Sequence, residues 1–194
     1  MNQPTVSLTD ISTYLPGEPI GANYYANFAG SDDLAANLMF RAPKFRHHVG
    51  PDETATDMIE RAAQGIIERH GRDIIESADV LITHTQVPDM AFYGQGGGIA
   101  HRLGLRPSWV LDLNNGGCAA FVLALNVARK LLSSGEGRTA LIAIAQNAAG
   151  QFFDQPTIRC KAQSAVPGDG AAVGLVTVGD HCLLYTSPSP RDRS

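Results

Sequence analysis

The chain has 194 residues, of which 44% are hydrophobic and 18% are charged, and its formal net charge at pH 7 is -4. This composition predicts one globular domain that buries about 70% of the surface its unfolded chain would expose, and it excludes a disordered chain. The chain also lacks the basic excess typical of proteins that bind nucleic acid or anionic membranes, so small molecules or proteins are the expected partners.

The three cysteines, Cys118, Cys160 and Cys182, are an odd number without zinc-like spacing. Met1 is followed by polar residues rather than by a signal peptide, and the chain has no apolar run long enough to span a membrane. These features predict a soluble cytoplasmic protein with reduced thiols, and we expect no metal or cofactor.

The first predicted elements are a strand at residues 5–11 and, after an irregular connection, a helix in "DETATDMIERAAQGIIERHG". Thr54 and Asp57 have the spacing of a capping box at the start of this helix, and Gly71 ends it. The apolar positions of the helix recur at intervals of three and four, so one face is expected to pack against a sheet.

Strand and helix signals alternate through the rest of the chain. Such alternation predicts an α/β fold with a largely parallel sheet that is covered on both faces. The expected strands are residues 78–85, 108–113, 139–146 and 170–178, and the expected helices are residues 96–105 and 118–134.

The end of the chain differs in composition from the rest. "CLLYTSPSPRDRS" is rich in Ser, Pro and Arg without periodicity, which is typical of a disordered tail. It also resembles the in-frame translation of a transposon-type sequencing adaptor. We therefore treat residues 181–194 as a non-native or disordered tail and expect the natural protein to continue past about Asp180.

Cys118 follows "NNGG" and begins the most apolar segment of the chain, which predicts a helix buried on all sides. A thiol at a helix N-terminus is stabilised as the reactive thiolate. The two preceding glycines allow a tight turn, and the Cys118 N–H could donate to a developing oxyanion. These features favour a catalytic nucleophile. The alternative is a structural thiol, because free cysteine is among the most buried residue types.

The segment "DLNNGGCAAFVLALNVARKLLSSG" resembles the active-site segment of the β-ketoacyl-ACP synthase III family, within the thiolase superfamily. The resemblance covers residues 5–180. The other matching motifs follow in order: "YLPGEPI", "PDETATDM", "VLITHTQVPDMAF" and "PGDGAAVGLV".

This resemblance implies that residues 1–180 form the N-terminal αβαβα half of a thiolase-like fold, with a mixed, largely parallel sheet around a buried helix. Two such halves pack face to face in the family, and the protein dimerises through its sheets, so a homodimer is implied.

The implied reaction has two steps. Cys118 takes an acyl group from acyl-CoA as a thioester, and decarboxylating malonyl-ACP attacks it to give β-ketoacyl-ACP in fatty-acid or specialised-metabolite synthesis. Acyl-CoA and the acyl carrier protein are therefore the implied partners. The family's histidine and asparagine come from the second half, so this chain alone is expected to be inactive.

The resemblance also implies roles for residues outside the thiol turn. Arg41 and Arg159, with Arg46 as a third, match arginines that bind CoA, although a solvated basic loop is the alternative. Phe92 matches a loop that closes the partner's acyl pocket across a homodimer, and a plain loop aromatic is the alternative. We expect the histidines at 47, 48, 70, 84 and 101 to be surface or structural residues.

Three functions stay open at this point. The first is a condensing enzyme of this family, the second an acyltransferase of the same fold that transfers the acyl group without decarboxylation, and the third a non-catalytic partner subunit. The presence of Cys118 counts against the third.

Overall fold

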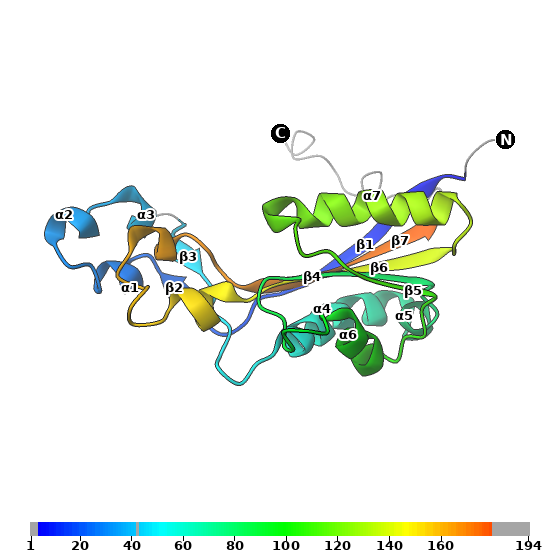
Figure 1. Cartoon of the computed structure of the whole chain (residues 1–194), viewed down its shortest axis with the longest axis horizontal. Coiled ribbons are helices and arrows are strands. Elements are labelled where there is room, and N and C mark those ends of the chain that lie inside the picture. The colour runs from blue at the N-terminus through cyan, green and yellow to red at the C-terminus, as the bar shows by residue number, and fades with distance from the viewer. Residues whose placement is uncertain (1–3, 42, 180–194) are drawn as a thin grey trace.

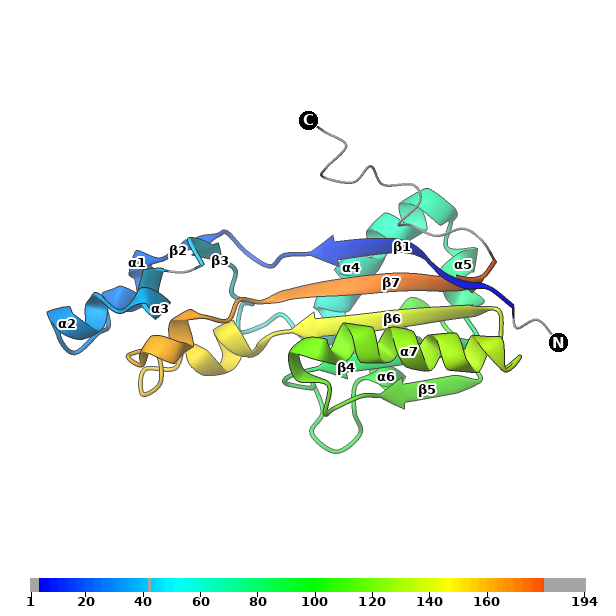
Figure 2. The ribbon, with the colours of Figure 1, turned by 90° about the horizontal axis from the view of Figure 1, so that it is seen from above.

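A five-stranded sheet forms the centre of the computed structural model, which describes residues 4–41 and 43–179. All of the predicted strands are present. Their order across the sheet is β1 (Val6–Tyr14), β7 (Gly170–Val178), β6 (Thr139–Gln146), β4 (Val80–Thr85) and β5 (Trp109–Asp112) (Figure 2).

The sheet is mixed. β4 pairs in parallel with β5 and with β6, whereas β7 is antiparallel to both β6 and β1. This confirms the mixed sheet that the resemblance implied, with two of its four pairings parallel and two antiparallel. The reason that β7 is antiparallel to β6 is the connection between them, which turns back at one end of the sheet instead of crossing over it, and such a return makes the two strands antiparallel.

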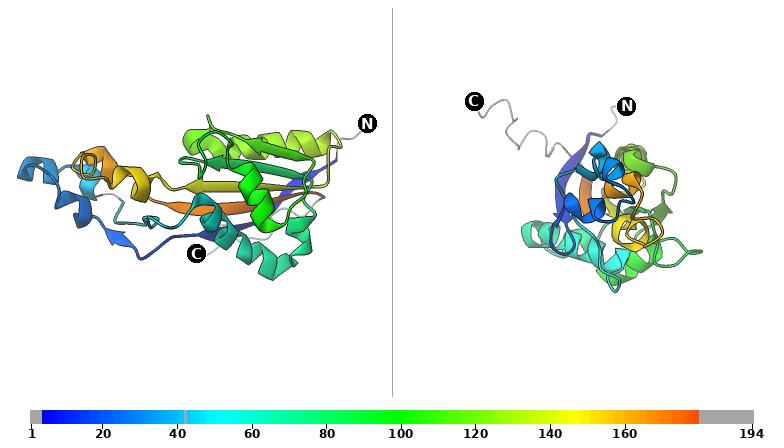
Figure 3. Two further views of the ribbon diagram at one scale, coloured as in Figure 1. Left: turned by 60° about the horizontal axis from the view of Figure 1, so that its bottom comes forward. Right: turned by 90° about the vertical axis from the view of Figure 1, so that its left-hand side faces the viewer.

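Helices cover both faces of the sheet, as expected. One face carries α7 (Ala120–Ser133), and the other carries α4 (Ala55–His70), α5 (Asp73–Glu76) and α6 (Gly96–Leu103) (Figures 1 and 3). Each layer has its own apolar core, one between the sheet and α4 and one between the sheet and α7.

The helix α4 confirms the boundaries predicted from its sequence. Thr54 and Asp57 form the reciprocal capping box, and Gly71 follows the last turn with φ 83°. The capping box satisfies backbone N–H groups that have no partner within the helix. Its fully buried apolar residues are Ala55, Met58, Ile59, Ala62, Ala63 and Ile66.

The helix α7 is buried on one face only, so the expectation of a helix buried on all sides is wrong for the structure described. The buried residues Ala120, Ala124, Ala128 and Leu132 recur every four residues, and the last three pack on the sheet. On the opposite side, Val122 is 60% exposed and Leu123 is 38% exposed. A single sheet offers a helix only one apolar face, and no other described element covers the second.

A small lobe extends beyond the carboxyl end of β6, where an irregular connection had been expected (Figure 1). Its apolar centre includes Tyr25 and Phe40. The lobe is built from β2 (Ile20–Gly21), α1 (Asn23–Ala26), α2 (Asp32–Ala35), α3 (Leu38–Arg41), β3 (Phe45–Arg46), the π-helical turn η2 (Ala149–Phe153) and the 3-10 turn η3 (Ala162–Ala165).

The carboxylate of Asp169 ties this lobe to the sheet. It accepts hydrogen bonds from the backbone N–H groups of Val49, Ala149 and Gly150, at 2.9, 2.8 and 2.7 Å. Burial raises the pKa of Asp169, although these three bonds act in the opposite direction. One buried side chain thus joins two segments about 100 residues apart in the chain.

The predicted tail, residues 181–194, lies outside the described residues. Over the residues that the structure does describe, no helix combines the length and apolar character needed to cross a membrane.

Asp57→Asn should lower the free energy of unfolding at neutral pH by about 1 kcal/mol, because it weakens the capping box. The hydrogen bonds from the Thr54 hydroxyl and N–H lower the pKa of Asp57 to about 2, and Arg102 adds to them. A lowered folded-state pKa means that the stabilisation is complete above about pH 4 and disappears as the pH falls through about 2.

Urea unfolding of both proteins across this pH range measures the difference in stability. The exposed Asp52→Asn is the control and should behave like the parent. A difference that stays constant from pH 7 to pH 2 would contradict the assigned role of the Asp57 charge.

Candidate active site

Cys118 is solvent-exposed on the single 3-10 turn Gly117–Ala119 that precedes α7. The α-helix itself begins two residues later than predicted. The turn is held by hydrogen bonds from Ala119 N–H to Gly116 O and from Ala120 N–H to Gly117 O. The thiol is therefore presented at the carboxyl end of β5, where the chain enters the helix. Cys160, in contrast, is half-buried in the lobe.

Two glycines make this turn possible. A Cβ at Gly116 would lie 2.6 Å from the Cα of Ala120, closer than side chains are found in folded proteins. Gly117 has φ 49°, in the left-handed region that favours glycine. The glycines in "NNGG" are thus required by the geometry of the turn, as the sequence predicted.

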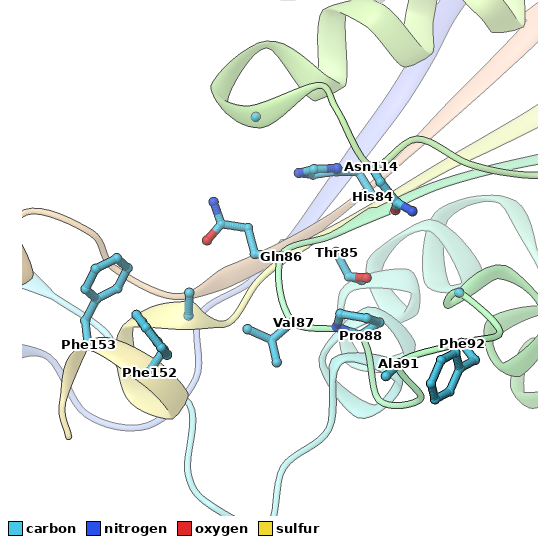
Figure 4. Close-up of a pocket in the computed structure, with 13 residues that line it drawn as sticks. His84, Thr85, Gln86, Val87, Pro88, Ala91, Phe92, Asn114, Phe152 and Phe153 are labelled. Carbon is cyan, nitrogen blue, oxygen red and sulfur yellow. The ribbon is translucent and has the colours of Figure 1, made fainter. Parts of the chain in front are cut away.

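A cavity of about 590 Å³ adjoins the thiol turn, within the range of about 300 to 1,000 Å³ of small-molecule sites. Asn114 and Gly117 line it from the segment between β5 and α7, the β4–α6 loop lines another wall, and Phe152 and Phe153 reach it from the lobe (Figure 4). Cys118 is not among the lining residues, but it follows the lining residue Gly117 directly, so its backbone borders this cavity.

The β4–α6 loop is fixed at its base and exposed at its tip. Asp89 accepts hydrogen bonds from the N–H groups of Ala55 and Thr56 at the start of α4, and the Asn147 carboxamide pairs with both backbone groups of Val87. At the tip, Phe92 is 96% exposed, and it also lines the cavity. The loop thus presents an aromatic ring from a rigid base.

Asp112 holds the other end of this loop. Its Oδ1 accepts hydrogen bonds from the N–H groups of Gln95 and Gly96, at 2.9 and 3.0 Å, and from the Thr83 hydroxyl. The carboxylate thereby connects β5 to β4 and to the start of α6. The sequence analysis missed Asp89, Asn147 and Asp112. The available signal was an acidic or amide side chain near the end of a strand or in the loop that follows it.

The three predicted CoA-binding arginines belong to the lobe and the segment next to it. Arg41 ends α3, and its side chain lies outside what the structure describes. The Arg159 guanidinium lies 3.8 Å from the centroid of the Phe28 ring, a cation–π contact. The roles of both in binding CoA stay predictions.

Arg46 is 3% exposed, and burial lowers its pKa. Its Nη2 donates to Pro43 O at 3.0 Å, while Nε and Nη1 have no partner among the described residues. A phosphate in solution does not reach this guanidinium, so the geometry favours a structural role for Arg46 over the predicted contact with CoA.

The histidines were expected to be surface or structural residues. His47 faces the Pro16 carbonyl, His48 pairs with the Tyr25 hydroxyl, His70 pairs with Asp10, and His101 is exposed. His84 differs from these four because it is buried and also lines the cavity.

Comparison with solved structures identifies the fold. The chain is similar to a crystal structure of 3-oxoacyl-(acyl-carrier-protein) synthase III with a TM-score of 0.75 and 25% identity, over 91% of this chain and 51% of the other. The priming β-ketosynthase of the R1128 polyketide pathway gives a TM-score of 0.76 at 23% identity, over 92% and 51% of the two chains. The fold is therefore thiolase-like.

Sequence comparison finds relatives of one family. The family model for 3-oxoacyl-[acyl-carrier-protein (ACP)] synthase III matches residues 111–186. The β-ketoacyl-ACP synthase III of Gloeobacter violaceus is 26% identical over 91% of this chain and 51% of its own length. That of Thioalkalivibrio sulfidiphilus is 34% identical over 51% of this chain and 30% of its own length.

The chain is thus related to the β-ketoacyl-ACP synthase III family, which confirms the resemblance found in the sequence. It spans about half the length of the first of these relatives and less of the second.

Gly116→Ala should destabilise the protein by about 1 to 3 kcal/mol, because the new methyl group meets backbone atoms of α7 that cannot move independently. Urea unfolding measures this loss. Gly97→Ala is the matched control, since a Cβ there meets nothing within 4 Å and should leave stability equal or higher. Equal stability of the Gly116 variant and the parent would show that the turn tolerates a side chain.

Proposed function

We propose that the protein is a β-ketoacyl-ACP synthase III-like condensing enzyme, an acyltransferase whose nucleophile is Cys118. The observation that carries this proposal is the exposed thiol on a glycine turn, at the start of a helix and beside a cavity. Thiolate is the nucleophilic form of cysteine, and the positive end of a helix dipole favours it. The family of the matched relatives supports the same chemistry.

In the first step, the Cys118 sulfur attacks the carbonyl carbon of an acyl-CoA. A new S–C bond forms, the bond to the CoA sulfur breaks, and the CoA thiolate leaves with a proton from the site. In the second step, malonyl-ACP loses CO₂, and the resulting carbanion takes the acyl group from Cys118. Neither step requires a metal or another cofactor, and both belong to primary or specialised lipid synthesis in the cytoplasm.

The second step is proposed for a protein that contains both halves of the relatives' length. Alone, the chain of 194 residues is expected to give no β-ketoacyl product. The apolar outer face of α7, with Val122 and Leu123 exposed, supports the view that another layer packs there.

A homodimer is part of this proposal. β5 is an edge strand, and Trp109 and Val110 on it are 39% and 43% exposed. An uncovered edge strand with apolar side chains is suited to pairing with another chain. The exposed Phe92 is then available to the acyl pocket of the partner.

Incubation of the chain with a short acyl-CoA should add the mass of one acyl group at Cys118, because the thiol and the cavity that borders its turn both belong to this chain. Cys118→Ala should abolish the adduct, whereas Cys160→Ala should retain it. Intact-mass analysis with peptide mapping measures both. An adduct that persists in Cys118→Ala would refute the assigned nucleophile, and a protein that forms no adduct at all would favour a non-catalytic partner subunit.

Arg41→Ala and Arg159→Ala should each weaken the binding of CoA about fivefold, since a guanidinium that contacts phosphate or stacks on an adenine contributes about 1 kcal/mol. The rate of acylation at saturating donor should stay the same, because these contacts hold the nucleotide equally in ground and transition states. Calorimetry and single-turnover acylation measure the two effects. Arg129→Ala, near the far end of α7, is the control, and unchanged binding in both lobe variants would refute their role.

A further inference from the structure

His84 is a buried histidine at the carboxyl end of β4 that takes no part in the steps above. Its side chain is 5% exposed. It is the only titratable residue among the thirteen that line the cavity (Figure 4). Burying an ionisable ring costs free energy unless its polar atoms have partners, so its place beside the thiol turn calls for an explanation.

Strand alternation orients His84 toward α7. Val80 and Ile82 pack in the core beneath α7, whereas Leu81 packs in the core on the α4 side. His84 is two residues beyond Ile82, and alternate residues of a strand share a face.

The parallel pairing then places His84 near the thiol. β4 and β5 run in the same direction, so their carboxyl ends lie at the same end of the sheet. From that end, β5 leads into the turn that carries Cys118. His84 therefore lies on the α7 side of the sheet, at the end where the thiol turn begins. Figure 4 shows its ring next to Asn114, in the segment that joins β5 to this turn.

The hydrogen bond of the imidazole determines which nitrogen carries the proton. Nδ1 lies 2.5 Å from Leu113 O, and a carbonyl oxygen can only accept. Nδ1 is thus the protonated nitrogen, and Nε2 of the neutral ring keeps a lone pair. Within residues 4–41 and 43–179, Nε2 makes no hydrogen bond of its own.

We propose that Nε2 of His84 accepts the proton of the Cys118 thiol, directly or through one water molecule. The transfer produces a thiolate and an imidazolium, and the Nδ1–H bond to Leu113 O stabilises the imidazolium. When the thiolate attacks a thioester, the leaving thiolate takes this proton back from Nε2. The identity of the attacked donor rests on the proposed function, whereas the proton transfer itself does not.

The charged side chains on the elements around His84 lie elsewhere or have other partners. The first turn of α7 has no acidic residue. The basic residues Arg129 and Lys130 lie toward the opposite end of this helix. Ile144 is the neighbour of His84 on β6. On β5, the Asp112 carboxylate accepts a hydrogen bond from Thr83, which faces the α4 side of the sheet. In the β4–α6 loop, the Asp89 carboxylate accepts a hydrogen bond from the start of α4.

The test measures alkylation of Cys118 by iodoacetamide as a function of pH, in a background with Cys160→Ser and Cys182→Ser. His84→Asn is the informative variant, because its amide N–H can still donate to Leu113 O while the base at Nε2 is gone. The midpoint of the rate profile should rise by about one pH unit or more. The exposed His101→Asn is the control and should leave the midpoint unchanged. An unchanged midpoint in folded His84→Asn would overturn the proposal.

A second measurement leaves His84 intact. The ring nitrogens of His84 are followed by ¹⁵N NMR during pH titration of the parent and of Cys118→Ala, in which an exposed side chain is removed. The two titrations should differ, and coincident titrations would overturn the proposal even if His84→Asn did not fold.

The two proposals fail separately. A raised alkylation midpoint without any acylation by acyl-CoA refutes the proposed function and supports the proton transfer. Acylation of Cys118 together with an alkylation profile that does not depend on His84 supports the proposed function and refutes the proton transfer.

Discussion

The carboxylate of Asp112 is the interaction on which the arrangement of the site depends. One oxygen accepts from the Thr83 hydroxyl on β4 and from two backbone N–H groups at the start of α6. It therefore fixes the end of β5, from which the thiol turn departs, relative to the loop that forms the opposite wall of the cavity. A charged acceptor makes such bonds stronger than neutral ones, so the two walls keep a defined separation.

The sequence predicted the elements of the fold more fully than their arrangement. The boundaries of α4 follow from local chemistry, because Thr54, Asp57 and Gly71 act within one helix. The direction of β7 and the one-sided burial of α7 could not be predicted in that way. Both depend on which elements are neighbours in space, and apolar periodicity alone does not contain that information.

In the candidate site, too, features set by consecutive residues were predictable, and features set by contacts between distant residues were not. The turn around Cys118 was predictable, since glycines with special backbone geometry leave a signal in consecutive residues. The place of His84 was not, because its role depends on a carbonyl 29 residues away in the chain. Arg46 was predicted to contact CoA because of the segment in which it lies. Its burial, which arises from packing against Tyr25 in the lobe, could not be predicted from that segment.

The alanines on the inner face of α7 have a consequence for how this site can change. Ala124 and Ala128 form a thin layer between the helix and the strands, and Ala120 is buried one turn earlier. The thickness of this layer determines the distance between the helix and the sheet. Almost every substitution in the layer adds volume, which a packed layer accommodates by moving the helix outward. Larger side chains at these positions would move the start of α7, and with it the thiol, away from the strand ends. Small side chains in this layer therefore keep the thiol close to the cavity.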